Sequence, residues 1–154
     1  MQTFLNILTV LAFIMSTSSW LLTAYNRSIR VSCRIIDFRK YPSGIIQLFM
    51  SIENNSEKSL IISGLSIISD KQKYPCELIS KKIRAINDVV VHATPNFPLN
   101  IAPIQGRNEF FEFLNCPDIE LVPGKTIEIE IYTNWKSLKR SLTLPQPGRF
   151  YPNH

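Results

Sequence analysis

Five basic side chains that follow an uncharged N-terminal block have the clearest capacity for chemistry. No charged residue occurs before them, and within their stretch only Asp37 opposes them. The five are Arg27, Arg30, Arg34, Arg39 and Lys40. Basic residues next to a membrane span attract anionic lipid headgroups, by about 1 kcal/mol each near a cytoplasmic surface. The same residues can instead only orient the span, so lipid contact and topology determination both stay open.

The cysteines Cys33, Cys76 and Cys116 could supply a nucleophile, metal ligands or a disulfide. A catalytic thiol needs a lowered pKa and usually a nearby base, and His92 is the only candidate base besides the terminal His154. A zinc site needs about four ligands, and no close Cys or His pair accompanies His92. We therefore predict structural thiols and no metal or cofactor. An odd cysteine count is not a disulfide framework, although a Cys76–Cys116 bridge stays open for an extracellular domain.

Two other patterns, a Gly-Lys-Thr motif and a set of carboxylates, do not indicate catalysis when the neighbouring residues are considered. Gly124-Lys125-Thr126 matches the end of a phosphate-binding loop, but that loop needs an earlier glycine, where this chain has Ile119, and a following helix. Carboxylate pairs could serve acid-base catalysis, but strand alternation predicts that most of these side chains are solvated. The carboxylates concerned are Glu109, Glu112, Glu128 and Glu130. We therefore predict no catalytic residues.

The chain has 154 residues, which suits one domain, and a formal charge of +5 from 17 basic and 12 acidic side chains. Binding of nucleic acid would need basic residues interleaved with exposed aromatics on one face. Here the basic residues are dispersed, and the alternation places most aromatics in the core. We therefore predict no nucleic-acid partner.

The uncharged block is long enough to cross a membrane. Residues 4–24 are apolar or neutral and number 21, close to the roughly 20 residues that a spanning helix needs. Trp20 and Tyr25 would lie near one interface, where amphipathic aromatics gather. We predict a retained transmembrane anchor over residues 1–26.

Two alternatives to a retained anchor are a cleaved signal peptide and a helix buried in a soluble domain. The apolar residues 7–15 and the small residues 16–19 fit a signal peptide, but no Lys or Arg precedes them and residues 20–22 resume the apolar run. A buried helix would have to bury an apolar surface on all sides inside a domain whose remaining sequence pattern predicts β-strands. The basic excess after the helix favours a cytoplasmic domain over an extracellular one.

Beyond the anchor, apolar residues alternate with polar ones, as in half-buried strands. The clearest alternation covers residues 28–38, 46–53 and 126–133, and a last strand is predicted over residues 138–144. In the second of these, the apolar side chains point inward and Gln47, Ser51 and Glu53 point outward. Turns are predicted at residues 41–44 and 122–125 and at Gly106. The proline-rich residues 94–103 cannot form a central strand, so they predict an edge or sheet-switching strand.

Residues 50–68 read MSIENNSEKSLIISGLSII, two apolar runs around a polar tip. This pattern predicts a β-hairpin, with Asn54 and Asn55 in left-handed conformations at a turn rather than at a functional site. The apolar phase slips at Gly64. A β-bulge there would return Leu65 and Ile67 to the same face as the preceding apolar residues.

The tally of seven to nine short strands predicts an all-β fold, an immunoglobulin-like two-sheet sandwich preceded by one transmembrane helix. The anchor covers residues 1–26, the sandwich covers 27–145, and a flexible tail covers 146–154. The Cys-Trp-Cys spacing of antibody domains is absent.

Four stretches in this order carry a resemblance: GIIQLFMSIENNSEKSLIISGLSI, YPCELI, TPNFPLNIAP and GRNEFFEF. The chain resembles uncharacterised small membrane-anchored β-sandwich proteins of low-GC Gram-positive bacteria and their mobile elements. The likeness covers most of residues 28–144 and lies at the level of fold. It implies a membrane-tethered sandwich and carries over no catalytic residues.

These observations together predict a non-enzymatic, membrane-tethered interaction or accessory module. Its expected partners are membrane lipid, through the five basic residues, and an unidentified protein. The alternatives are a secreted or surface structural sandwich released by signal-peptide cleavage, and an enzyme with a site built from loop carboxylates and lysines.

Overall fold

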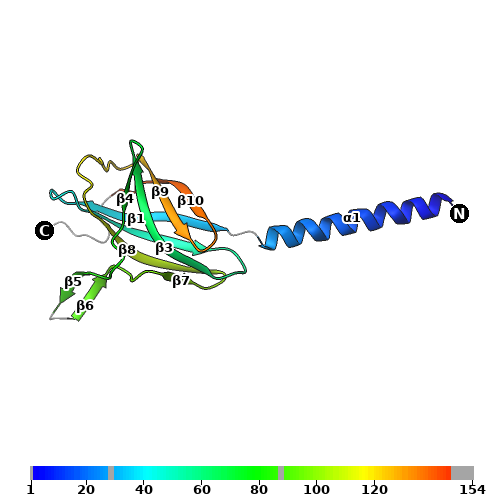
Figure 1. Cartoon of the computed structure of the whole chain (residues 1–154), viewed down its shortest axis with the longest axis horizontal. Coiled ribbons are helices and arrows are strands. Elements are labelled where there is room, and N and C mark those ends of the chain that lie inside the picture. Colours follow the sequence, from blue (N-terminus) through cyan, green and yellow to red (C-terminus); the bar gives the residue numbers. More distant parts are fainter. Residues whose placement is uncertain (1, 28–29, 87–88, 147–154) are drawn as a thin grey trace.

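The computed structural model describes residues 2–27, 30–86 and 89–146 (Figure 1). One helix, α1 (Gln2–Arg27), leads into a domain of strands. The end of the predicted tail, residues 147–154, lies outside the described residues.

Two antiparallel sheets build the sandwich. One is a three-stranded sheet in the order β1 (Val31–Lys40), β2 (Ile46–Asn54) and β8 (Gln105–Phe113). The other is a five-stranded sheet in the order β10 (Ser137–Thr143), β9 (Thr126–Thr133), β3 (Leu60–Ser69) and β4 (Gln72–Pro75), with β7 (Leu99–Ile101) also paired to β3. A separate hairpin joins β5 (Lys82–Ile86) and β6 (Val89–Ala93). The predicted two-sheet sandwich behind one helix is confirmed.

The core lies between the two sheets. Strands β2, β3 and β9 supply most of its fully buried aliphatic side chains, and β8 supplies two aromatic ones. They include Ile46, Leu48, Met50, Ile52, Leu60, Ile62, Leu65, Ile67, Phe111, Phe113, Ile129 and Ile131. Burial of one such side chain contributes about 1.5–3 kcal/mol, which makes this layer the main source of stability.

The predicted bulge at Gly64 is confirmed. Ile62 pairs with Thr133 while Gly64 pairs with Tyr132, so one extra residue of β3 lies between two neighbouring pairs of the ladder. The extra residue brings Leu65 onto the buried face that Ile62 already occupies. Its effect is to keep the apolar face of β3 continuous.

The predicted hairpin over residues 50–68 is wrong. Strand β2 pairs with β1 and β8, whereas β3 pairs with β4, β7 and β9, so the two strands belong to different sheets. The polar residues between them carry the chain across the sandwich. Alternation could not separate these cases, because two strands that pair and two that face each other across a core have the same apolar period.

Neither Asn54 nor Asn55 adopts a left-handed conformation, which corrects the prediction for the polar tip. The non-glycine residues with positive φ in the described part of the chain are Asp70, Lys71, Ile104 and Asn115. Asn54 is instead fully buried and satisfies neighbouring backbone carbonyls. In a connection between two sheets, the buried polar groups must be hydrogen-bonded, whereas a tight turn is not required.

The turns at residues 41–44 and 122–125 are confirmed, with glycines at φ +76° and +81°. The turn predicted at Gly106 is wrong, since Gly106 lies inside β8 and pairs with Glu53. The chain turns at residues 103–104 instead. Strand β7 lies at the edge of its sheet, which confirms the prediction for the proline-rich segment.

Some residues predicted to face outward are buried. Gln47 and Ser51 point away from the core but are covered, because β2 is a central strand and its outer face carries other side chains. Glu130 is also buried, beneath Lys73 and Tyr132. Facing away from the core is therefore not the same as facing water.

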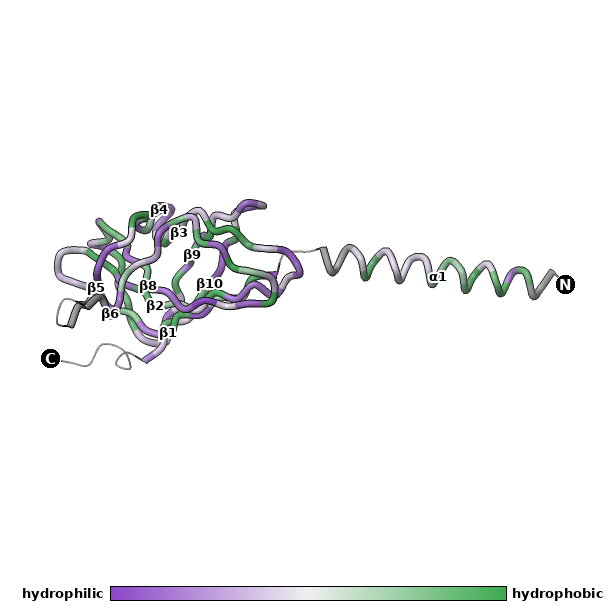
Figure 2. Tube along the Cα trace, turned by 90° about the horizontal axis from the view of Figure 1, so that it is seen from below, coloured by the Kyte–Doolittle hydropathy of each residue, from purple (hydrophilic) through white to green (hydrophobic). Residues whose placement is uncertain are grey.

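Helix α1 projects from the sandwich (Figures 1 and 2). Its segment Leu5–Thr23 is 19 residues long, apolar enough to cross a membrane, and 0% buried. The exposure contradicts the buried-helix alternative. Length and composition alone also fit a signal sequence, so the anchor and the cleaved signal both remain open.

Candidate functional site

The five basic residues predicted to touch lipid do not lie together. Arg27 is the last residue of α1, Arg30 lies just before β1, and Arg34 lies on the exposed outer face of β1. Arg39 and Lys40 end the same strand, nine residue steps and roughly 30 Å from its start. The strand runs away from α1 in Figure 1, so these two residues lie at the end of the sandwich opposite the helix.

Lys40 and Arg39 make contacts within the protein. The Lys40 ammonium donates to the carbonyl oxygens of Pro117 and Ile119, each at 2.8 Å. The Arg39 guanidinium lies 4.9 Å from the centre of the Tyr41 ring. Lys40 thus fixes the connection between β8 and β9.

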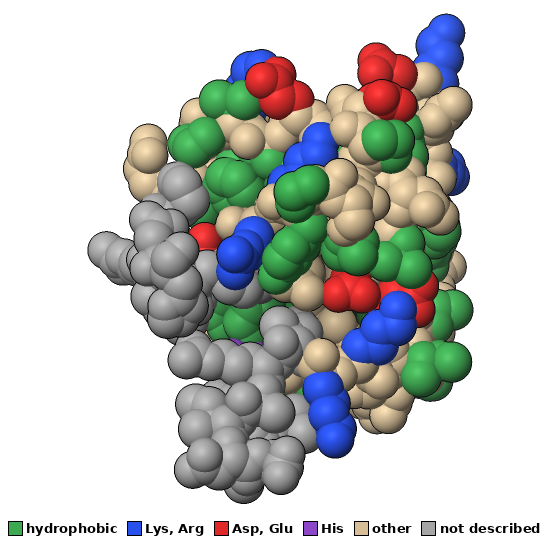
Figure 3. All heavy atoms as spheres, turned by 90° about the vertical axis from the view of Figure 1, so that its left-hand side faces the viewer, with side chains coloured by type: hydrophobic (Ala, Val, Ile, Leu, Met, Phe, Trp, Pro, Cys, Tyr) green, Lys and Arg blue, Asp and Glu red, His purple; other side chains and the backbone are tan. Residues whose placement is uncertain are grey.

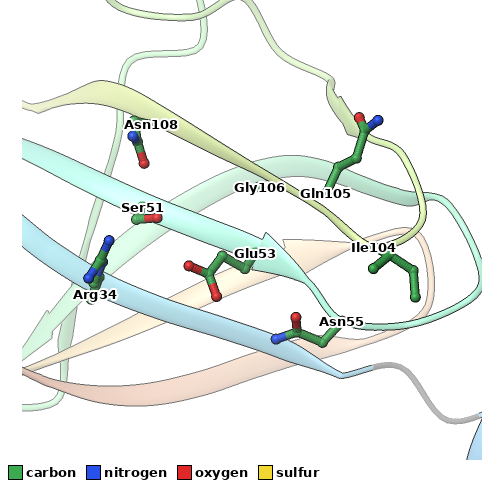
Figure 4. A pocket seen from close by; sticks show the side chains of 8 residues that line it. All are labelled: Arg34, Ser51, Glu53, Asn55, Ile104, Gln105, Gly106 and Asn108. Carbon is green, nitrogen blue, oxygen red and sulfur yellow. The ribbon is translucent and has the colours of Figure 1, made fainter.

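A polar depression of about 350 Å³ lies on the outer face of the three-stranded sheet, in the half nearer α1. Figure 4 shows its side chains, which come from all three strands and two loops. They are Arg34, Ser51, Glu53, Asn55, Ile104, Gln105, Gly106 and Asn108. A smaller hollow of about 220 Å³ shares Arg34, Ser51 and Glu53 with it. The sequence suggested only that some of these residues point outward.

Two hydrogen bonds through Ser32, which lines the smaller hollow, link the depression residues Glu53 and Asn55. The Ser32 hydroxyl donates to Glu53 Oε2 at 2.9 Å, and the Asn55 amide donates to Ser32 Oγ at 3.1 Å. Figure 4 shows the Glu53 carboxylate directed along the sheet toward Arg34. The depression therefore presents a guanidinium, a carboxylate and amides, which together can pair with both donors and acceptors of a partner.

The outer strand β8 borders the depression. Within the described residues, positions 105–109 of β8 pair with β2 alone, while the far end of the strand is bridged at Phe113 by Cys76. An edge strand offers backbone groups to an added strand. The edge and the depression are continuous, so one extended segment could use both.

Aromatic residues cover the other half of this outer face. Phe49 and Phe110 stack with ring centres 4.3 Å apart, and His92 of β6 lies 5.0 Å from Phe110. His92 thus packs against an aromatic ring on the outer face of this sheet. Among the described residues, no group of three or more His, Cys, Asp or Glu side chains is arranged to hold a metal ion.

All three cysteines are free thiols. Burial raises the pKa of Cys33 to about 12 and that of Cys76 to about 11, and it also raises the pKa of Cys116. A reactive thiol needs the opposite shift. The placement of Cys76 and Cys116 near loops was predicted, but their burial was not.

A second polar cluster lies on the outer face of the five-stranded sheet. Lys73 Nζ lies 2.5 Å from Glu130 Oε2, and the Tyr132 hydroxyl donates to the same carboxylate at 3.1 Å. The ion pair with Lys73 lowers the pKa of Glu130, and the bond to Glu130 raises that of Lys73. Glu77 and Glu112 likewise raise the pKa of Lys81. Lys73 belongs to β4 and Glu130 to β9, so no sequence spacing signals their pairing.

Comparison with protein-family models and with curated proteins finds no match. The geometry of the chain itself therefore carries the functional argument.

Proposed function

We propose that the protein is a membrane-tethered, non-enzymatic binding module. The observation that carries the proposal is an exposed apolar helix of spanning length joined to a β-sandwich through only three residues, 28–30. Such a link holds the domain beside the membrane. The polar depression and the adjoining edge of β8 form its proposed surface for a protein partner.

The charges support a non-catalytic role. A nucleophilic lysine needs a lowered pKa, whereas the pKa values of Lys73 and Lys81 are raised by neighbouring carboxylates. Raised thiol pKa values argue in the same direction for Cys33 and Cys76.

The order of the strands supports the immunoglobulin-like class. Strands β1, β2 and β8 correspond in order to A, B and E of that fold, and β10, β9, β3 and β4 correspond to G, F, C and C′. We propose this assignment together with the resemblance to small membrane-anchored sandwich proteins of low-GC Gram-positive bacteria.

Site-specific photo-crosslinking tests the binding surface. A photoreactive residue at Asn108, on the rim of the depression, is expected to capture a protein partner in cells that produce the full chain. The same group at Ser141, exposed on β10, is the matched control. Equal adducts from both positions, or adducts from Ser141 alone, would refute the assignment of the surface.

The proposed orientation places the sandwich on the cytoplasmic side, as the basic residues after the helix favour. A Ser43→Cys variant tests it, because Ser43 is exposed in the β1–β2 turn while Cys76 and Cys116 are buried. An impermeant thiol reagent is expected to label this variant in lysed cells and not in intact ones. The unmodified chain gives the background, and labelling from outside would reverse the orientation.

A further inference from the structure

The end of the sandwich nearest α1 has a composition of its own. Strand registers bring the start of β1 beside the end of β2 and the start of β8, and the start of β3 beside the end of β9. Three loops therefore meet there, residues 55–59, 102–104 and 134–136. We call them the anchor-side loops, and they lie toward α1 in Figure 1.

Two large apolar side chains project from the anchor-side loops. Ile104 is 69% exposed, and Trp135 is 51% exposed. Ile104 also has a φ of +53°, a left-handed conformation that a β-branched residue rarely adopts. Ile104 also lines the polar depression (Figure 4). Water is a poor environment for both side chains, and a lipid interface suits them.

The charge of these loops is positive. Lys58 and Lys136 are exposed, and Glu57 is the one carboxylate in the three loops. Lys58 Nζ lies 4.8 Å from the centre of the Trp135 ring, so a cation and an indole are presented together. The opposite end mixes both signs, as Figure 3 shows. In the loop between β8 and β9, Asp118 is exposed and Glu120 pairs with Lys125 at 3.2 Å.

The loops are held in place before any ligand arrives. The backbone N–H of Ile104 donates to Ser56 O at 3.3 Å. Asn134 exchanges two hydrogen bonds with Ile61, at 3.0 and 3.1 Å. A preformed surface loses little conformational entropy when it binds.

The distance to the membrane completes the argument. Three residues separate the end of α1 from the start of β1, and an extended chain of that length spans at most about 14 Å. If α1 spans a bilayer, the anchor-side loops must therefore lie at or near the headgroup layer.

We propose that the anchor-side loops dock on an anionic phospholipid surface, with Trp135 and Ile104 in the interface and Lys58 and Lys136 on the headgroups. The inference rests on the proposed membrane tether. It replaces Arg39 and Lys40, at the far end of β1, as the candidates for lipid contact.

Tryptophan quenching in the full-length chain tests this docking. A Trp20→Phe substitution leaves Trp135 as the only tryptophan, because the chain contains two. The variant is reconstituted into vesicles of phosphatidylcholine, with or without phosphatidylserine, and compared with the same protein in detergent. Acrylamide quenching of Trp135 is expected to fall roughly threefold or more in phosphatidylserine vesicles. In the same vesicles, lipids brominated near the headgroup are expected to quench the fluorescence of Trp135.

Two controls separate docking from simple tethering. A Trp20→Phe/Trp135→Phe/Ser43→Trp chain reports on the far end and should stay accessible to acrylamide. Lys136→Glu should weaken the shielding of Trp135, whereas Lys82→Glu, at an exposed lysine of β5, should not.

Flotation of the same vesicles distinguishes the two ways of failing. A chain that floats with Trp135 as accessible as in detergent would refute docking and leave the tether intact. A chain that floats with equal shielding in both lipids would refute the anionic preference. A chain that does not float would overturn the tether and the docking together.

Discussion

Asn54 shows how one polar side chain can organise a crossing between sheets. It is 0% exposed, and its amide N–H groups point at the carbonyl oxygens of Lys58, Ile101 and Ala102 at 2.7, 3.2 and 3.1 Å. Its carbonyl accepts from the backbone and the hydroxyl of Ser56. The side chain thus ties two of the anchor-side loops together, which a two-residue turn would not require.

Replacing Asn54 by Ala should lower the free energy of unfolding by about 2–4 kcal/mol, because several buried backbone groups lose their partners. Urea unfolding of the full chain in mild detergent measures the loss. Asn55→Ala is the matched control: its exposed side chain makes one bond, to Ser32 Oγ, and should cost less than about 1 kcal/mol. Equal losses at the two positions would contradict this assignment.

Glu130 makes stability depend on pH. Its pKa is lowered from 4.5 by the bond to Lys73, then by further hydrogen bonds, among them that from Tyr132. A carboxyl group with a lower pKa in the folded state stabilises that state above pH 4.5. The contribution disappears as the pH falls through the folded value.

A Glu130→Gln chain should therefore lose less stability than the parent chain between neutral pH and pH values below 4.5. Thermal unfolding over a pH series measures the difference. Glu128→Gln is the comparison, because Glu128 is more exposed and lies 3.9 Å from Lys139. Parallel pH profiles for Glu130→Gln and the parent would count against the role of the ion pair.

At the scale of elements, Gly44 and Gly64 have different structural roles. Gly44 has a φ of +76° in the β1–β2 turn, and a Cβ there would lie 3.4 Å from the backbone nitrogen of Pro117. Gly64 marks the bulge but has no positive φ, and an added Cβ would meet Leu78 and Tyr132 at 3.4 and 3.7 Å, ordinary contact distances. The bulge comes from the register of β3, and glycine itself is not required there.

Gly44→Ala should cost about 1–2 kcal/mol, because an L residue is strained in the left-handed region. Gly64→Ala should change stability by less than about 1 kcal/mol, because the added methyl meets no close contact. Paired denaturant titrations of the two variants give the comparison. A greater loss at Gly64 than at Gly44 would mean that the bulge itself needs glycine.

At the scale of the whole molecule, the helix and the sandwich differ in how they treat their apolar side chains. The segment Leu5–Thr23 of the helix exposes its apolar side chains, while the sandwich buries its own core. The apolar segment Leu5–Thr23 is 0% buried, and in the proposed arrangement a bilayer covers it.

The proposed retained anchor predicts that the mature protein keeps its N-terminus. Intact-mass measurement of membrane-extracted protein is expected to give 17.7 kDa, and the protein should stay with membranes at alkaline pH. A mass short by the first two dozen or so residues, with soluble protein, would identify a cleaved signal instead.

The sequence alone determined the period-two strands, the bulge at Gly64, the turns at residues 41–44 and 122–125, and the apolar N-terminal helix. These features are local, because they follow from which side chain faces water at each step of the chain. The pairing of strands was not local. Residues 50–68 gave the right strands and the wrong partners, since the apolar period is the same for neighbours in a sheet and for strands across a core.

Only the tertiary structure decided which polar residues share a surface. It separated Arg39 and Lys40 from α1, buried Glu130 against Lys73, and brought Lys58, Ile104 and Trp135 to one end. Lys58, Ile104 and Trp135 lie far apart in the chain and belong to loops, where no period constrains the side chains. Their meeting is a consequence of strand register, which the packing of the whole core sets.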